Sequence, residues 1–192
     1  HGRMPAIASG ALFANRALVG IGVSGDGDTV SIGMGGFVHL MRRNLPLIYI
    51  IEDNGCYGLT KGQYSPTSEA GKITKSTPMG SVDHPFNPVS LALGAEGTFV
   101  ARTIDVDVNH LTETLRRAAA HKGAAFVEVY QNCKIFNDAV LGTSVPVGIT
   151  TVYTTYALYD LSKTRFQTIW PLPIGGSRGV ACITSNLTNQ LR

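Results

Sequence analysis

Two apolar runs, each followed closely by a short polar turn, constrain the fold of this chain more than any other feature. The run at residues 18–24 leads into Gly25-Asp26-Gly27-Asp28, and the aliphatic run Leu45–Ile51 leads, after two acidic residues, into Asn54-Gly55. Short apolar runs bounded by turn residues are typical of buried strands. A nearly continuous aliphatic run is expected in a parallel sheet that is covered on both faces. We therefore expect two strands, each ending in a polar turn.

The other segments alternate between helix-like and strand-like patterns. Such alternation predicts an α/β fold with a doubly wound, mostly parallel sheet and helices on both faces. A long segment without periodicity, Glu52–Pro85, is expected to be a functional loop. The expected helices are residues 4–17, Thr29–Arg43, Pro88–Glu96 and 108–122, and the further expected strands are Thr98–Ile104 and Ala124–Tyr130.

The sequence changes character near residue 139. From there to residue 192 it contains no Glu, its charges are sparse, and Thr, Ser, Tyr and Gly accumulate without a helical or strand period. We expect one domain at residues 1–138 and an irregular C-terminal tail at residues 139–192. The first residue is not Met, so we also expect the domain to be incomplete at its N-terminus.

Composition excludes several classes of function. The chain has 192 residues, 44% hydrophobic and 15% charged, and a net charge of +3. The pairs Arg42-Arg43 and Arg116-Arg117 fit solvated helix ends better than a nucleic-acid surface. No apolar run is long enough to span a membrane, and no secretory signal is evident. With three widely spaced cysteines, the expected location is the reducing cytoplasm.

The two polar turns carry oxygen ligands suited to a metal ion. In open α/β sheets, ligands bind at the carboxyl ends of the strands, and a helix that begins there favours a diphosphate. Mg²⁺ prefers oxygen ligands and commonly bridges protein to phosphate. Asp26 offers a carboxylate, Asn54 an amide oxygen, and Cys56 a backbone carbonyl. A lone Gly-Asp-Gly is also an ordinary turn, but the spacing to Asn54 favours a cofactor site, while the P-loop and dinucleotide glycine motifs are absent.

These residues resemble a known family. Gly25-Asp26-Gly27 with Asn54 is similar to the thiamine-diphosphate fingerprint, with Gly55 where a second Asn is common. The segment Tyr57-Gly58-Leu59-Thr60-Lys61-Gly62-Gln63-Tyr64-Ser65-Pro66-Thr67 resembles the β subunit of 2-oxoacid:ferredoxin oxidoreductases, most closely the 2-oxoglutarate (KorB-like) type. The resemblance covers residues 1 to about 138.

The resemblance implies a reaction, cofactors and partners. The reaction is the oxidative decarboxylation of a 2-oxoacid, with 2-oxoglutarate to succinyl-coenzyme A as the favoured case, and electrons pass through an iron–sulfur cluster to ferredoxin. Thiamine diphosphate and Mg²⁺ are the implied cofactors, and an α subunit, ferredoxin, the 2-oxoacid and coenzyme A the implied partners. The implied metal ligands are Asp26, Asn54 and the Cys56 carbonyl. The implied cofactor-binding residues are Gly25, Asp26, Gly27, Asp28, Ile32, Asn54, Tyr57, Gly58, Leu59 and Thr60.

Residues of the loop just past the metal site also receive expected roles. Lys61 and Thr60 are the candidate catalytic residues, because a cation there could meet the substrate carboxylate or coenzyme A; a solvated loop lysine is the alternative. Gln63, Ser65 and Thr67 are expected to order the loop.

Cys133 resembles the last iron–sulfur ligand of the family. One thiolate cannot hold a cluster that usually needs four ligands. Cys133 therefore serves as a ligand only if further cysteines lie upstream, and otherwise it is a free thiol.

Two other interpretations stay open. The fingerprint alone also fits a non-oxidative thiamine-diphosphate enzyme, such as a decarboxylase or synthase. The missing cysteines and the unusual tail fit an inactive fragment that lacks the iron–sulfur segment.

Overall fold

A computed structural model of the chain describes residues 1–138 and 152–153. Its main sheet has the strand order β1-β2-β6-β5-β7. The first four of these strands run parallel, and β7 is antiparallel to β5. The strands span Gly20–Gly25 (β1), Leu47–Asp53 (β2), Phe99–Ile104 (β5), Ala125–Tyr130 (β6) and Val152–Tyr153 (β7).

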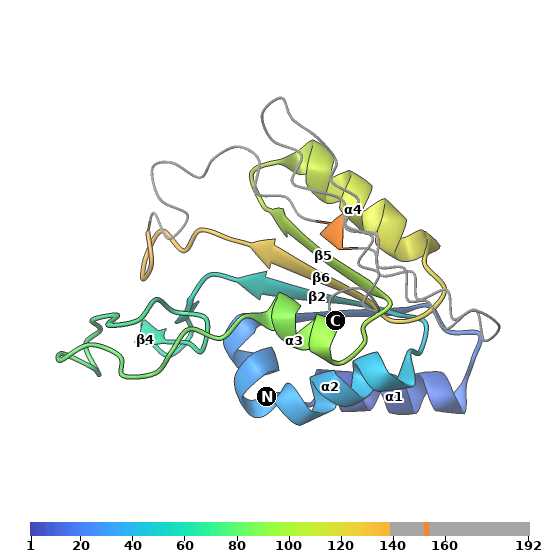
Figure 1. The fold of residues 1–192 in the computed structure, drawn as a ribbon, viewed down its shortest axis with the longest axis horizontal. Coiled ribbons are helices and arrows are strands. Elements are labelled where there is room, and N and C mark those ends of the chain that lie inside the picture. The colour runs from blue at the N-terminus through green and yellow to red at the C-terminus, as the bar shows by residue number, and fades with distance from the viewer. Residues whose placement is uncertain (139–151, 154–192) are drawn as a thin grey trace, which may run out of the picture.

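Helices cover both faces of this sheet, and each face has its own apolar core (Figure 1). The helices α1 (Met4–Ala14), α2 (Met34–Arg43) and α3 (Pro88–Gly94) lie on one face, and α4 (Val108–Ala120) lies on the other. The first core joins α1, α2 and α3 to β2, with the Phe37 ring against both Tyr49 and Phe126. The second core packs Leu111, Leu115 and Ala118 of α4 against β5 and β6.

The strand order explains why α4, among the described helices, lies on the opposite face from the other three. The chain moves across the sheet from β1 to β2 and then past β6 to β5, and it turns back from β5 to β6. Parallel connections are almost always right-handed, so a reversal of direction carries the connecting helix to the opposite face. The expected doubly wound α/β fold with a mostly parallel sheet is therefore confirmed.

The first strand differs from its expectation. It was expected to be buried, but it lies at the edge of the sheet with only β2 beside it among the described strands. Val19, Ile21 and Val23 are consequently exposed, while Gly22 packs against Met4 and Tyr49. An apolar run identifies a strand but not its position in the sheet, because position depends on long-range pairing.

The helix expected at Thr29–Arg43 is divided in two. Residues Asp28–Ile32 form one π-helical turn, η1, and α2 begins after Gly33. The α1 helix ends at Ala14, three residues before its expected end. Single π-helical turns often occur at functional sites, and this one follows the Gly-Asp-Gly turn directly.

The long loop is present, but it begins after Asp53 and not at Glu52, because β2 extends to Asp53. A small hairpin lies within it. Strands β3 (Cys56–Tyr57) and β4 (Gln63–Tyr64) pair antiparallel. The loop that contains β4 lies beyond the carboxyl ends of β2 and β6 (Figure 1). The irregular tail expected at residues 139–192 lies outside the described residues, apart from Val152–Tyr153 in β7.

No helix in the described part of the chain is both long enough and apolar enough to cross a membrane.

Candidate functional site

The ends of β1 and β2 bring the two polar turns together. The strands pair in parallel with Gly25 opposite Glu52, so the residues that follow, Asp26 and Asp53, leave the sheet side by side. Asn54 comes next in the chain. The local sequence thus places a carboxylate, a second carboxylate and an amide at one edge of the sheet, where α/β folds bind ligands.

The long loop folds back over this edge and contacts both carboxylates. Ser65 donates a hydrogen bond to Asp26 Oδ2 through its hydroxyl. The Thr67 hydroxyl lies 2.6 Å from Asp26 Oδ2 and 2.8 Å from Asp53 Oδ1. A hydroxyl carries one proton, so Thr67 can donate to only one of these carboxylates at a time. Ser65 and Thr67, which were expected only to order the loop, therefore also bind the central carboxylate of the site.

Three carboxyl groups form a buried cluster here. Asp26, Asp53 and Glu128 are 2%, 5% and 0% exposed. Burial and the charge of Asp53 raise the pKa of Asp26 to about 6. Burial and the charge of Glu128 raise the pKa of Asp53 to about 7. The site is thus short of positive charge, which favours a bound cation.

Glu128 is anchored by an arginine. Arg102 Nε donates a hydrogen bond to Glu128 Oε2, and its guanidinium also lies 4.6 Å from the centre of the Tyr130 ring. Burial raises the pKa of Glu128, while Arg102 opposes that shift. Among the described residues, no group donates a hydrogen bond to Glu128 Oε1. A proton shared between Asp53 and Glu128 would supply one, and it would also relieve the repulsion between the two carboxylates.

The carboxyl cluster predicts a pH-dependent stability for the ligand-free chain. Because the folded pKa values of Asp26 and Asp53 lie above their unfolded value of 3.8, the folded state binds more protons between about pH 4 and 7. The free energy of unfolding should therefore fall by roughly 2–4 kcal/mol from pH 5.0 to 7.5 in urea titrations, and then level off.

The variant Asp53→Asn isolates this effect. In this variant, the change in the free energy of unfolding between pH 5.0 and pH 7.5 should be at most half of that in the unmodified chain. Burial lowers the pKa of His110 and of His121, so both act in the opposite sense, but equally in both proteins. An unchanged pH dependence in the variant would contradict the assignment to the carboxyl cluster.

Hydrogen bonds between side chains and backbone amides within residues 53–56 stabilise the turn at Asn54. The Cys56 amide lies 3.3 Å from Asn54 Oδ1, and the Gly55 amide donates to Asp53 Oδ1 at 3.1 Å. Gly55 has φ of +60°, a left-handed conformation that only Gly and, less readily, Asn or Asp adopt without strain. This explains why either Gly or a second Asn suits this position.

Gly27 in the first turn allows a close approach of the loop instead of a left-handed backbone. A Gly-Asp-Gly sequence is typical of a tight turn, in which glycine supplies a positive φ, but neither Gly25 nor Gly27 has a positive φ. A Cβ at Gly27 would lie 2.3 Å from the Tyr57 ring. The Tyr57 hydroxyl also donates to the Gly27 carbonyl at 3.3 Å. Gly27 therefore allows close approach of the loop, and this contact joins two segments that were expected to bind the cofactor.

Asp28 and Ile32 lie on the side of the site near the N-terminus. Asp28 accepts hydrogen bonds from the Gly2 amide, at 2.6 Å, and from the Ser24 hydroxyl. Its carboxylate is therefore occupied with protein groups, and this ties the N-terminal residues to η1. The Ile32 side chain is exposed.

The next expected residues form the exposed tip of the β3–β4 hairpin. The Lys61 amide donates to the Gly58 carbonyl at 3.1 Å, and Lys61 has φ of +77°. Thr60 donates to Gln63 through its side chain, and the Leu59 side chain is almost fully exposed. These contacts lie within the hairpin and do not reach Asp26. The roles expected for this tip stay predictions.

The two described cysteines lie beside the Asn54–Gly55 turn (the metal turn), which carries an expected metal ligand. The Cys56 thiol lies 3.5 Å from Asn54 Oδ1. Burial, and to a smaller extent the neighbouring Cys133, raises the pKa of Cys56 to about 12. Partial burial opposes the shift, but the backbone amides of Phe136 and Ile135 and the neighbouring Cys56 side chain lower the pKa of Cys133. Within the described residues, no three His, Cys, Asp or Glu side chains are arranged to hold a metal ion.

The expected Mg²⁺ ligands fit a magnesium ion by their chemistry. Asp26, Asn54 and the Cys56 carbonyl would supply oxygen atoms only, which suits Mg²⁺. The buried carboxyl cluster around Asp26 carries more negative than positive charge, so a dication would compensate it. These observations support the expected site without placing the ion.

Sequence reasoning missed several residues of this site. Glu128 is a buried acid within an otherwise largely apolar strand, and Asp53 is a buried acid at the end of β2, next to the exposed Glu52. A charged residue in an aliphatic strand was the available signal. Thr67 was expected only to order the loop, and its contacts with the carboxylates gave no local signal. Asn137 gave none either, because its contact with Asn54 joins residues far apart in the chain. Only the folded loops bring them to the metal turn.

Comparison with known proteins agrees with this geometry. Residues 1–129 match the family model for the thiamine pyrophosphate enzyme, C-terminal TPP binding domain. The 2-oxoglutarate oxidoreductase subunit KorB of Mycobacterium tuberculosis (strain ATCC 25618 / H37Rv) is 62% identical over 138 residues, which cover 72% of this chain and 37% of that protein. The 2-oxoacid:ferredoxin oxidoreductase subunit beta of a Sulfolobus species is 46% identical over 138 residues, which cover 72% of this chain and 45% of that protein.

A solved structure gives the same result. The 2-oxoglutarate:ferredoxin oxidoreductase from Magnetococcus marinus, with 2-oxoglutarate, coenzyme A and succinyl-CoA bound, aligns with a TM-score of 0.68 and 39% identity. The alignment covers 72% of this chain and 47% of that one. The chain thus spans between about a third and a half of the length of these relatives. The expected likeness to β subunits of 2-oxoacid:ferredoxin oxidoreductases is confirmed, and the chain belongs to the thiamine pyrophosphate enzymes through the C-terminal TPP binding domain in residues 1–129.

Proposed function

We propose that this chain is the cofactor-binding part of the β subunit of a 2-oxoacid:ferredoxin oxidoreductase. The observation that carries the proposal is the contact of Ser65 and Thr67 with Asp26, because it joins the segment that resembles this enzyme class to the carboxylate of the thiamine-diphosphate fingerprint. The 62% identity to a KorB subunit supports 2-oxoglutarate as the substrate.

Asp26, Asn54 and the Cys56 carbonyl would hold Mg²⁺, and through it the diphosphate of thiamine diphosphate. When bound, the cofactor supplies a carbanion and an electron sink for decarboxylation of a 2-oxoacid. A bound dication would lower the pKa of Asp26 from its value of about 6 and keep the carboxylate ionised, while Ser65 and Thr67 hold the carboxylate in place. Gly25, Gly27, Asp28, Ile32, Tyr57, Gly58 and Leu59 complete the proposed cofactor-binding surface.

Lys61 and Thr60 are the proposed substrate-facing residues. Both are exposed at the tip of the β3–β4 hairpin, and the left-handed backbone at Lys61 fixes the direction in which that tip turns. An ammonium group there would attract the carboxylate of a 2-oxoacid or the phosphates of coenzyme A. The Thr60 hydroxyl, which bonds to Gln63, would orient the same segment.

The proposed partners are an α subunit, ferredoxin and coenzyme A, in line with the names of the relatives. An iron–sulfur cluster does not fit the described residues, because Cys133 and Cys56 offer two sulfur atoms where a cluster needs four ligands. The role of Cys133 as a cluster ligand stays a prediction that depends on cysteines elsewhere.

The activity assay combines the full chain with its α subunit, 2-oxoglutarate, coenzyme A and a viologen acceptor. We expect viologen reduction that requires both the 2-oxoacid and thiamine diphosphate. Lys61→Met should raise the KM for 2-oxoacid or coenzyme A by about 10-fold or more, as for loss of one charge-assisted hydrogen bond. Lys75→Met, at an exposed lysine of the same loop, should leave both KM values unchanged.

The outcomes separate the alternatives. Release of carbon dioxide without viologen reduction would indicate a non-oxidative decarboxylase instead. Failure of the complex to act on any 2-oxoacid would contradict the proposal, and failure of the chain to bind thiamine diphosphate would indicate an inactive fragment.

A further inference from the structure

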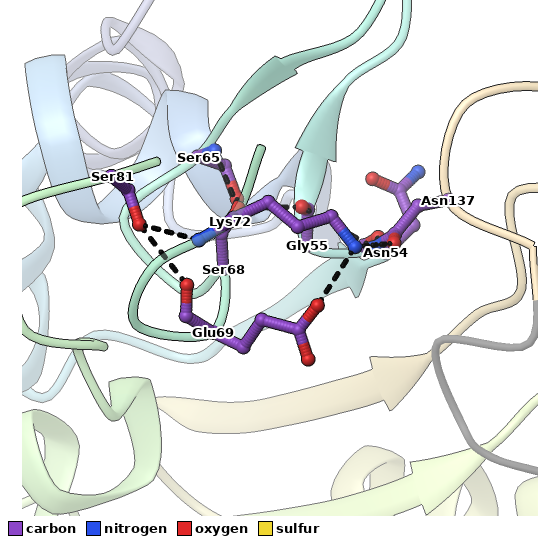
Figure 2. Close-up of polar contacts among 8 residues, drawn as sticks. All are labelled: Asn54, Gly55, Ser65, Ser68, Glu69, Lys72, Ser81 and Asn137. Atoms are coloured by element: carbon purple, nitrogen blue, oxygen red, sulfur yellow. Dashed lines mark hydrogen bonds and ion pairs between the residues drawn. The ribbon is translucent and has the colours of Figure 1, made fainter. Parts of the chain in front are cut away.

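Asn137, a buried residue outside the expected site, binds the backbone carbonyls of the Asn54–Gly55 turn. Asn137 is 5% exposed. Its Nδ2 donates to the Asn54 carbonyl at 2.7 Å and lies 3.3 Å from the Gly55 carbonyl. Figure 2 shows Asn137 beside the Asn54–Gly55 turn. A buried backbone carbonyl needs a hydrogen-bond partner, so this side chain satisfies two carbonyls of the turn that carries the metal ligand.

Lys72 fixes the orientation of that side chain. Its Nζ donates to Asn137 Oδ1 at 2.6 Å and to Glu69 Oε1 at 3.0 Å. An ammonium group is a donor only, so it selects the carbonyl end of the amide. The amino end of Asn137 must then point toward the carbonyls of Asn54 and Gly55.

Lys72 is itself held within the long loop. Its backbone amide donates to the Ser81 hydroxyl at 3.0 Å, and Ser81 donates in turn to the Glu69 carbonyl at 3.1 Å. Ser68, from the same loop, donates to the Gly55 carbonyl at 2.6 Å. The long loop therefore holds the metal turn on one side, directly through Ser68 and indirectly through Lys72.

The loop after β6 holds the turn on the other side. The Gln131 amide donates to the Asp53 carbonyl at 2.8 Å, and Asn54 Nδ2 lies 3.5 Å from Gln131 Oε1. The Asn137 amide donates to the Cys133 carbonyl at 2.9 Å. Asn137 thus joins three segments that are distant in sequence: the metal turn, the long loop and the turn at Cys133.

We propose that Asn137 is a positioning residue, which holds the Asn54–Gly55 turn in the geometry that Mg²⁺ and thiamine diphosphate require, and that Lys72 orients it. The inference rests on the proposed function. Asn137 would touch neither ion nor cofactor; it acts through Asn54, whose amide oxygen is a proposed ligand. Loss of a residue that orients a metal ligand typically lowers metal affinity about 10–100-fold.

Three variants test this role. Asn137→Ala removes the side chain, and Asn137→Asp keeps its size but replaces the donor that faces two carbonyls with an acceptor. Lys72→Met keeps the length of the lysine and removes the charge that orients Asn137. The matched controls are Asn109→Ala, at an exposed asparagine of α4, and Lys75→Met.

Two measurements on the full chain separate the inference from the proposed function. The first is amide hydrogen exchange without any ligand. Both Asn137 variants should exchange faster in a peptide that spans residues 52–60, with unchanged protection in β5 and α4, which also shows that the variants are folded. The second is calorimetric titration with thiamine diphosphate at saturating Mg²⁺, and with Mg²⁺ at saturating thiamine diphosphate. We expect affinity to fall about 10–100-fold in the Asn137 variants, by less in Lys72→Met, and not in the controls.

The three informative results are distinct. Wild-type exchange rates in the Asn137 variants would overturn the inference, whether or not the chain binds the cofactor. Faster exchange with unchanged affinity would also overturn it, because the contacts would then stabilise the loop without positioning a ligand. If the wild-type chain binds no thiamine diphosphate, the proposed function fails, and the ligand-free exchange data alone decide whether Asn137 holds the turn.

Discussion

Exchange of Asp26 for Asn is expected to reduce the affinity for thiamine diphosphate and Mg²⁺ by more than about 100-fold, a larger loss than removal of a residue that only orients a ligand. Asn keeps the shape of the side chain and one oxygen, but it removes the charge that a dication requires. Calorimetric titration of the full chain measures the effect. Asp83→Asn is the matched control, because Asp83 is exposed and bonds to the Tyr64 hydroxyl, away from the buried carboxyl cluster.

The same substitution should not destabilise the ligand-free chain at pH 7.5. Asp26 is ionised there although burial and Asp53 raise its pKa to about 6, so its charge opposes folding. We expect the free energy of unfolding to rise by roughly 1–2 kcal/mol in Asp26→Asn. Higher stability with lost affinity is typical of residues kept for function. Retained affinity would contradict the metal site, and a loss of stability would contradict the electrostatic account of the cluster.

Exchange of Arg102 for Met should destabilise the chain more than any other of these substitutions, by about 3–5 kcal/mol at pH 7.5, because Glu128 would remain buried without its ion pair. Arg102 also donates to Asn87 Oδ1 at 3.2 Å and lies over the Tyr130 ring, so contacts to α3 and β6 are lost as well. Urea unfolding followed by circular dichroism measures the difference. The loss should be smaller at pH 5, where Glu128, whose pKa burial raises, takes up a proton more readily.

A double variant tests the cause of this loss. In Arg102→Met with Glu128→Gln, no uncompensated charge remains, so a large part of the lost stability should return. The exposed pair Arg116–Glu113 on α4 serves as the control, and Arg116→Met should cost less than about 1 kcal/mol. Equal losses in the single and double variants would show that Arg102 acts by packing rather than by charge.

Local pattern was enough to predict the fold class and the centre of the site. The aliphatic run that became β2 and the acidic turn after β1 are both local signals, and a parallel sheet brings the ends of its strands to one edge whatever the rest of the sequence. Asp26 and Asn54 are therefore recognisable as candidate ligands from the sequence alone. The family resemblance depends mainly on the Tyr57–Thr67 segment, which the fold places against the same carboxylate.

The position of each strand within the sheet could not be predicted in this way. Ile21 and Val23 are as apolar as the aliphatic residues of β2, yet β1 lies at the edge of the sheet among the described strands, and both side chains are exposed. The role of Gly27 likewise could not be predicted from the local sequence. Its sequence context indicated a turn, but the reason for glycine is the Tyr57 ring, which arrives from the loop that follows β2.

The sequence by itself therefore determined which residues are chemically suited to bind a metal and a diphosphate, because their types and their places at strand ends follow from local patterns. Only the tertiary structure decided which residues surround them. Three contacts join segments that are far apart in the chain: Thr67 with Asp26 and Asp53, Glu128 with Arg102, and Asn137 with Asn54. The physical reason is that a hydrogen bond or an ion pair depends on distances of a few ångströms, and for such residues those distances are set by the packing of loops against the sheet.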